Sequence, residues 1–151
     1  MRALLIIAAL ALSPAADITS GPAPGASPGP PTEATLRALL AAFNAHDLDR
    51  VMTFFAEDCE LDMPRGKEPW GARYVGKAAV REGLATRFAG LPDVHYSDDT
   101  HWVAGNRGVS TWLLTGTTKT GERVRVRGVD LFEFRAGKIV KKDSYWKIVE
   151  K

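Results

Sequence analysis

The sequence predicts an α+β protein, with helices in the first half of its folded part and one long antiparallel sheet in the second. Between residues 36 and 88, apolar residues recur at positions i, i+3, i+4 and i+7, the spacing of one helix face. From residue 95 onward, long stretches typical of strands are separated by short turns that contain glycine. Helices that precede such a sheet have to cover one of its faces, which sets the general architecture.

The helical spacing defines three helices. The apolar face of the first consists of Leu36, Leu39, Leu40 and Phe43. The second helix begins after Asp47, a suitable N-cap. Its apolar face consists of Leu48, Val51, Met52 and Phe55. The third helix ends at Gly90. Its apolar face consists of Val80, Leu84 and Phe88.

Five strands are predicted around and after these helices. A short strand, 59–63, lies between the second and third helices. Four long strands come after the third helix, and the hairpin-length turns between them predict an antiparallel meander. These strands span 95–104, 109–118, 123–134 and 138–149.

The first 31 residues precede this domain and divide into two segments. One positive charge at Arg2, an apolar run at 3–12 and small residues at 13–16 are typical of a secretory signal peptide. The run is too short for a permanent transmembrane helix, which needs about 20 apolar residues. We therefore predict a signal peptide at 1–16 and a secreted or periplasmic protein; the alternative is a mis-assigned start codon before a cytoplasmic domain. Residues 17–31 have the Pro, Gly, Ala and Ser content of a disordered linker, which leaves one domain at 32–151.

Charge and short motifs narrow the classes of partner. The 151 residues include 20 basic and 18 acidic side chains, and the net charge of +2 gives no argument for a nucleic acid or, after signal cleavage, a membrane as partner. Metal-binding spacings of His and Cys and phosphate-binding glycine loops do not occur in the sequence, so no metal and no cofactor is predicted. Cys59 is the only cysteine and is expected to be buried.

Asp130 is the candidate catalytic residue. In strand 123–134 it shares a face with Gly128 and Phe132, no positive charge lies within two residues on that face, and three arginines project from the opposite one. A carboxylate in apolar surroundings takes its neutral form or needs a specific partner. Two interpretations therefore stay open, an acid in a functional pocket and an ion pair that serves the structure.

Three segments resemble the SnoaL-like members of the nuclear transport factor 2-like superfamily. They read FNAHDLDRVMTFFAEDCELDMPRG, EPWGARYVGKAAVREGLATRFAGLPDVHY and VRGVDLFEFRAGKIVKKDSYWKI. The resemblance covers about 32–151 and implies a cone-shaped, curved antiparallel sheet wrapped around the three helices, with a pocket in the open cone. It also implies that no cofactor is obligatory and that a homodimer is expected.

Catalytic residues of known branches of this superfamily match the chain only in part. Where ketosteroid isomerases have their base and a helical tyrosine, this chain has Met63 and Leu39; only their oxyanion-binding acid is matched, by Asp130. Limonene-type epoxide hydrolases would need an arginine at Gly128 and a second aspartate near Ser144. Polyketide cyclases of the SnoaL type need one carboxylate in an apolar pocket to move a proton beside a carbonyl, a demand that Asp130 alone meets.

Aromatic and sulfur side chains supply the predicted substrate contacts. Trp70 lies in the loop at the expected mouth of the cone and is predicted to act as a lid or to stack on a flat ligand. The other residues predicted to contact a substrate are Met63, Trp112, Phe132 and Trp146.

A polar group in strand 95–104 receives a different interpretation. His95, Asp99 and His101 would share one face of a regular strand. Because the two histidines are six residues apart, about 20 Å in an extended strand, they cannot ligate one metal ion. We predict an exposed polar face here.

The sequence therefore predicts a protein whose pocket takes a small, largely apolar organic molecule. If it is an enzyme, we expect a cofactor-independent isomerase, cyclase or dehydratase that transfers a proton through Asp130. The alternative is a non-catalytic exported protein of the same fold that binds a ligand or dimerises. Met63, in place of a base, favours binding over isomerase chemistry.

Overall fold

The computed structural model describes residues 29–150. The predicted signal peptide, 1–16, and all but the last three residues of the predicted linker, 17–31, lie outside the described residues. No helix in the described part of the chain has the length and apolar character needed to cross a membrane.

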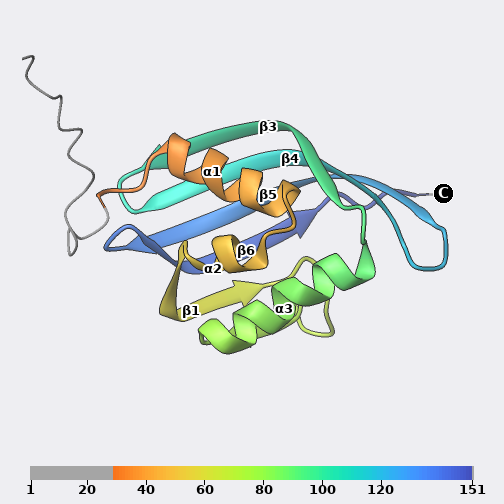
Figure 1. Cartoon of the computed structure of the whole chain (residues 1–151), viewed down its shortest axis with the longest axis horizontal. Coiled ribbons are helices and arrows are strands. Elements are labelled where there is room, and N and C mark those ends of the chain that lie inside the picture. The colour runs from red at the N-terminus through yellow and green to blue at the C-terminus, as the bar shows by residue number, and fades with distance from the viewer. Residues whose placement is uncertain (1–28, 151) are drawn as a thin grey trace, which may run out of the picture.

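One six-stranded sheet forms the body of the protein, in the order β2-β1-β6-β5-β4-β3 (Figure 1). Strands β3 to β6 make the predicted antiparallel meander, whereas β1 pairs in parallel with β6. Strand β2, which the sequence did not predict, pairs with the other side of β1. The strands are Phe55–Asp62 (β1), Arg73–Val75 (β2), His95–Ala104 (β3), Arg107–Thr117 (β4), Arg123–Arg135 (β5) and Lys138–Trp146 (β6).

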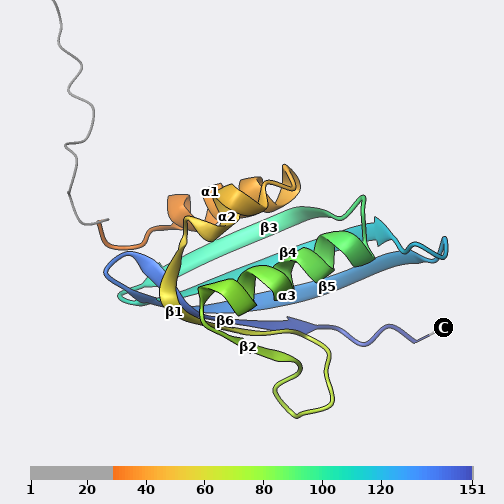
Figure 2. The ribbon, with the colours of Figure 1, turned by 60° about the horizontal axis from the view of Figure 1, so that its bottom comes forward.

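Three helices cover one side of this sheet (Figure 2): α1 (Glu33–Asn44), α2 (Leu48–Met52) and α3 (Lys77–Gly90). Helix α1 starts at a capping box, in which the Thr32 hydroxyl accepts a hydrogen bond from the Thr35 N–H. Helix α2 starts at the predicted N-cap, where Asp47 accepts a hydrogen bond from the Arg50 N–H at 2.9 Å. The α+β architecture is thus confirmed.

The predicted extent of the second helix is wrong. Helix α2 ends at Met52, and Phe55 begins β1, where it pairs with Ile139 of β6. Phe55 is fully buried, as the apolar spacing required. A buried apolar residue three positions after Met52 is compatible with a longer helix and with the start of a strand. The spacing of apolar residues alone therefore does not show where α2 ends.

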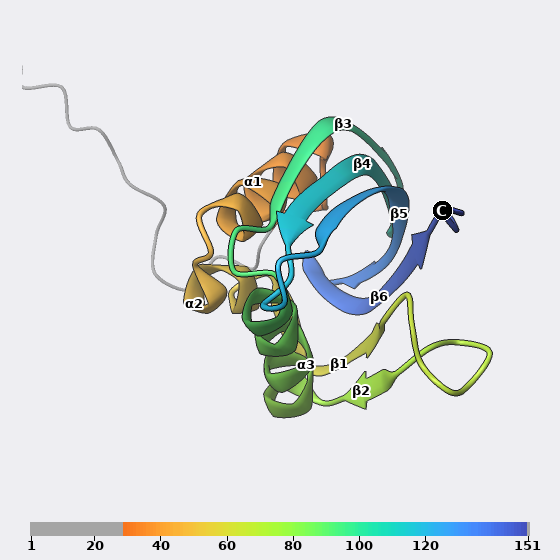
Figure 3. The same ribbon diagram turned by 90° about the vertical axis from the view of Figure 1, so that its right-hand side faces the viewer.

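The sheet is strongly curved, and its concave face encloses the core (Figure 3). Trp112 and Phe132 are buried there in one cluster with the apolar face of α1. A Cβ atom at Gly128 would lie 2.2 Å from the Trp112 ring, so glycine is what allows this ring to lie against β5. The arginines of β5 are exposed on the opposite face, as the alternation of the strand predicted.

Candidate functional site

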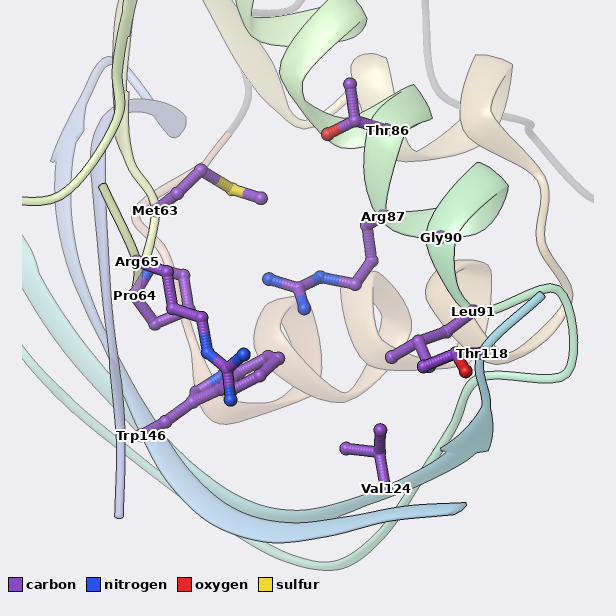
Figure 4. Close-up of a pocket in the computed structure, with 10 residues that line it drawn as sticks. All are labelled: Met63, Pro64, Arg65, Thr86, Arg87, Gly90, Leu91, Thr118, Val124 and Trp146. Carbon is purple, nitrogen blue, oxygen red and sulfur yellow. The ribbon is translucent and has the colours of Figure 1, made fainter. Parts of the chain in front are cut away.

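A cavity of about 260 Å³ opens at one end of the sheet, between the C-terminal part of α3 and the strands β5 and β6 (Figure 4). The loop after β1 and the β4–β5 connection complete its wall. The lining residues are Met63, Pro64, Arg65, Thr86, Arg87, Gly90, Leu91, Thr118, Val124 and Trp146. None of them is an aspartate, glutamate, histidine or cysteine, so the wall has no side chain that ordinarily titrates near neutral pH.

The loop between β1 and β2 carries Met63 and Arg65 to this cavity. Two backbone hydrogen bonds close the loop, from the Met63 N–H to the Ala72 carbonyl at 2.9 Å and from the Ala72 N–H to the Arg65 carbonyl at 3.0 Å. Gly71 has a φ of +81°, and a Cβ atom there would lie 1.8 Å from the Met63 carbonyl oxygen. The turn therefore requires glycine, which fixes where the two lining residues lie.

Two arginines approach Trp146 in the cavity (Figure 4). The guanidinium carbon of Arg87 lies 4.4 Å from the centroid of the ring, and that of Arg65 lies 5.1 Å from it. Burial lowers the pKa of Arg87, an effect that Tyr96 and Asp130 nearby partly offset. Neither guanidinium forms an ion pair with any residue from 29 to 150. Two guanidinium groups thus contact the same indole ring, and no carboxylate of residues 29–150 pairs with either of them.

The structure brings only two of the predicted contact residues to this cavity, Met63 and Trp146. Trp112 and Phe132 lie deeper, 2% and 3% exposed, and are not part of the wall. Trp70 is 47% exposed in the loop, where the Arg73 guanidinium lies 5.1 Å from its ring centroid, and it does not line the cavity either. The two arginines were missed because no local pattern distinguishes them from surface arginines.

Asp130 is buried and accepts three hydrogen bonds. Lys142 Nζ donates to its Oδ1 at 2.6 Å, Ser144 Oγ donates to the same oxygen at 2.7 Å, and Trp112 Nε1 donates to Oδ2 at 3.0 Å. No cation lies within two residues of Asp130 on its own strand, as the sequence indicated, but Lys142 of the neighbouring strand β6 supplies one. Asp130 does not line the cavity.

Lys142 is as buried as its partner, with 8% of each side chain exposed. Its ammonium group also donates to Ser144 Oγ at 2.6 Å. Burial lowers the pKa of Lys142, and the Asp130 carboxylate acts in the opposite direction. Of the two interpretations that the sequence left open for Asp130, these contacts therefore favour an ion pair that serves the structure.

A second buried polar group lies on β3 and β4. His101 Nδ1 lies 2.8 Å from Ser110 Oγ, and His101 Nε2 lies 2.9 Å from Asp99 Oδ2. The predicted exposed face is wrong for His101, which is 4% exposed. The pairing of β3 with β4 shifts between Ser97 and Thr100, and this irregularity reverses the faces that a regular strand would have.

Asp99, His101 and Ser110 are the side-chain types of a hydrolytic triad, but in the described part of the chain they have no substrate cavity and the serine is not accessible. None of them lines the cavity between α3, β5 and β6. Ser110 is 4% exposed, so a substrate carbonyl has no route to its oxygen. Among residues 29–150, no three His, Cys, Asp or Glu side chains are grouped so that they could hold a metal ion.

Comparison with known proteins agrees with this fold. The model of the SnoaL-like domain matches residues 36–142. The chain belongs to the SnoaL-like family. A candidate polyketide cyclase from Xanthomonas campestris is similar in structure, with a TM-score of 0.66 and 24% identity over 74% of this chain and 87% of its own. A protein of ketosteroid isomerase-like fold from Catenulispora acidiphila, in complex with trimethylamine, has a TM-score of 0.66 and 20% identity over 75% and 85%. TerC, co-crystallized with polyporic acid, has a TM-score of 0.64 and 22% identity over 74% and 88%.

Within this SnoaL-like fold, the departures from two catalytic branches are built into the core. Leu39, which by the resemblance takes the place of the isomerase tyrosine, is 3% exposed on α1. An arginine at position 128, which an epoxide hydrolase would need, has no room, because Trp112 occupies the space above that glycine. Ser144, near the second aspartate of those hydrolases, instead donates to Asp130.

Proposed function

We propose that this protein binds a small organic molecule in the cavity between α3, β5 and β6, and that binding rather than catalysis is its function. One observation carries the proposal: the cavity has an apolar wall and two cationic side chains, and none of its lining residues is an acid or base of ordinary near-neutral pKa. Asp130, the predicted acid, lies behind the wall with both oxygens engaged. The small organic ligands in the TerC and C. acidiphila structures support a ligand for this fold.

Gly90 offers a direct test of the cavity. It is the last residue of α3 and lines the cavity, and a Cβ atom there would have no heavy atom within 4 Å. A tryptophan at this position can therefore be accommodated on the wall of the cavity without disturbing the core, where we expect it to obstruct a ligand. Its neighbour Ala89 is exposed and does not line the cavity, so Ala89→Trp is a matched control.

The experiment is mass spectrometry of small molecules that co-purify with the protein from its native host. A molecule bound to wild type and to Ala89→Trp, but lost from Gly90→Trp, is the expected result. The proposal fails if Gly90→Trp retains the same molecule at the same occupancy, since a tryptophan on the cavity wall is expected to obstruct the ligand.

A cofactor-independent proton-transfer enzyme is the second candidate. It is favoured by the nearness of the Asp130 carboxylate to Arg87, a residue of the cavity wall whose pKa burial lowers and Asp130 partly restores. Such an enzyme exchanges the acidic C–H protons of its bound molecule with solvent. Deuterium incorporation in D₂O, followed by NMR, should stay at the buffer rate under the binding proposal. Fast incorporation that Asp130→Asn/Lys142→Met abolishes would establish the enzyme instead.

Two further properties complete the proposal. The convex face of the sheet exposes Trp102, Leu131 and Tyr145, 52%, 42% and 51% exposed, and such apolar residues support a homodimer. Light scattering during gel filtration measures the mass, and a monomer at micromolar concentration would exclude a stable dimer.

Export is supported by the sequence at 1–16, and a mature protein that begins within 15–18 is expected. An intact Met1 on soluble cytoplasmic protein would contradict export.

A further inference from the structure

We propose that the molecule bound in this cavity is a small organic anion, whose acidic group lies between Arg65 and Arg87 while its apolar part contacts Met63, Leu91 and Val124. This inference rests on the proposed binding function and names the chemical class of the ligand. It replaces the largely apolar molecule that the sequence predicted with an amphipathic one.

The first step of the argument concerns Arg87. Protein surrounds its guanidinium closely enough for burial to lower its pKa, yet no carboxylate of residues 29–150 forms an ion pair with it. A cation in that position is costly unless a counter-charge accompanies it. The Trp146 ring offsets part of the cost through a cation–π contact at 4.4 Å. An anionic ligand would supply the missing charge.

The second step concerns the pair of guanidinium groups. Arg65 comes from a loop that Gly71 fixes, and Arg87 from α3, yet both lie over the same ring. The two charges repel each other, since Arg65 contributes to the lowered pKa of Arg87, and an anion between them would attract both. Guanidinium groups also match the geometry of a carboxylate, which accepts two parallel hydrogen bonds from each.

The third step concerns the surroundings of the cavity. An adjoining hollow shares Pro64, Arg65, Val124 and Trp146 with it. Its other lining residues include three cations and one acid: Arg123, Arg125, Lys147 and Glu122. This excess of positive charge beside the cavity raises the local concentration of anions and repels cations.

Size and polarity limit the ligand further. The cavity, about 260 Å³, is smaller than the ~300–1,000 Å³ of pockets for drug-sized ligands. One ring with a short acidic side chain fits this volume. The apolar lining of Met63, Leu91 and Val124 favours a hydrocarbon or aromatic body over a sugar.

The test uses a series of phenylalkyl probes that differ in chain length and, at each length, in the charge of the head group. Phenylacetate, 3-phenylpropionate and 4-phenylbutyrate are titrated into the full-length mature protein by calorimetry, together with the corresponding amides and the amine 3-phenylpropylamine. We expect at least one carboxylate to bind ten times more tightly than its amide, and the amine not to bind. Arg87→Met should remove that advantage, because methionine keeps an apolar stem but carries no charge.

Arg81→Met is the matched control, since Arg81 lies on the same helix but is exposed and pairs with Asp49. It should bind the carboxylate as wild type does. If the amides bind as tightly as the carboxylates, or if Arg87→Met and Arg65→Met both keep the preference, the inference is overturned while the binding function stands. If Gly90→Trp binds the probes as wild type does, the proposed function itself fails.

Discussion

The ion pair between Asp130 and Lys142 decides whether the predicted acid belongs to the structure or to a reaction. Asp130→Asn keeps the shape of the side chain but leaves the Lys142 ammonium without its counter-charge, 2.6 Å away in the wild type. Removal of one partner from a buried pair costs about 3–5 kcal/mol, out of a total stability of about 5–15 kcal/mol. For a slope of about 2 kcal/mol per molar urea, the midpoint should fall by about 2 M.

The pH dependence of this variant has a definite sign. Burial lowers the pKa of Lys142 even beside Asp130, and without that carboxylate the pKa falls further. The unfolded chain then binds more protons than the folded one below the ordinary lysine pKa of 10.5, so stability rises with pH through that window. The deficit of Asp130→Asn should therefore shrink between pH 7 and pH 10.

Urea unfolding followed by tryptophan fluorescence at pH 7 and at pH 9.5 measures both effects. The double variant Asp130→Asn/Lys142→Met is the control, because it removes both charges and should recover most of the stability. If Asp130→Asn stays within about 0.5 kcal/mol of wild type at pH 7, the structural interpretation of Asp130 is refuted.

The remaining predictions concern packing, acid stability and capping. Gly128→Ala should destabilise the protein by about 1–3 kcal/mol, as thermal melts will show, because its Cβ would overlap the Trp112 ring; an unchanged melt would contradict this packing. Burial raises the pKa of Asp62, but hydrogen bonds from Arg73 and Lys141 outweigh this effect and lower the pKa below 3.8. Stability from this carboxylate is thus present above pH 4 and lost as the pH falls further, and Asp62→Asn should flatten that acid limb in urea titrations. Thr32→Ala should cost about 1 kcal/mol in the same assay, and no loss would show that the capping box is dispensable.

Features set by local periodicity are predicted from the sequence, whereas features set by the register between strands are missed. Alternation in β5 places Asp130 on the concave face correctly, because the side-chain period is local. Its partner lies across the β5–β6 hairpin, whose pairing shifts between Glu133 and Phe134, so the contact with Lys142 could not be read from one strand. The family resemblance in turn implied the curved sheet and its pocket, which no spacing of residues shows.

The polar residues of β3 and the arginines of the cavity were likewise not predictable from the sequence of one strand or helix. Asp98 has a φ of +48°, at the point where the pairing of β3 with β4 shifts, and this irregularity turns His101 into the core. Arg65 and Arg87 lie 22 positions apart in the chain and meet only at Trp146, on the last strand. Met63 was singled out by its match to the base of ketosteroid isomerases and Trp146 as an aromatic residue on a strand, whereas the two arginines match no such pattern.

The central claim, that the ligand lies in the cavity between α3 and the ends of β5 and β6, is tested most directly by NMR with the co-purified molecule. The methyl signal of Met63 and the indole N–H signal of Trp146 should shift on binding, because both side chains line the cavity. The indole signal of Trp102, exposed on the convex face, should stay in place. Shifts at Trp102 with unchanged signals for Met63 and Trp146 would contradict the account.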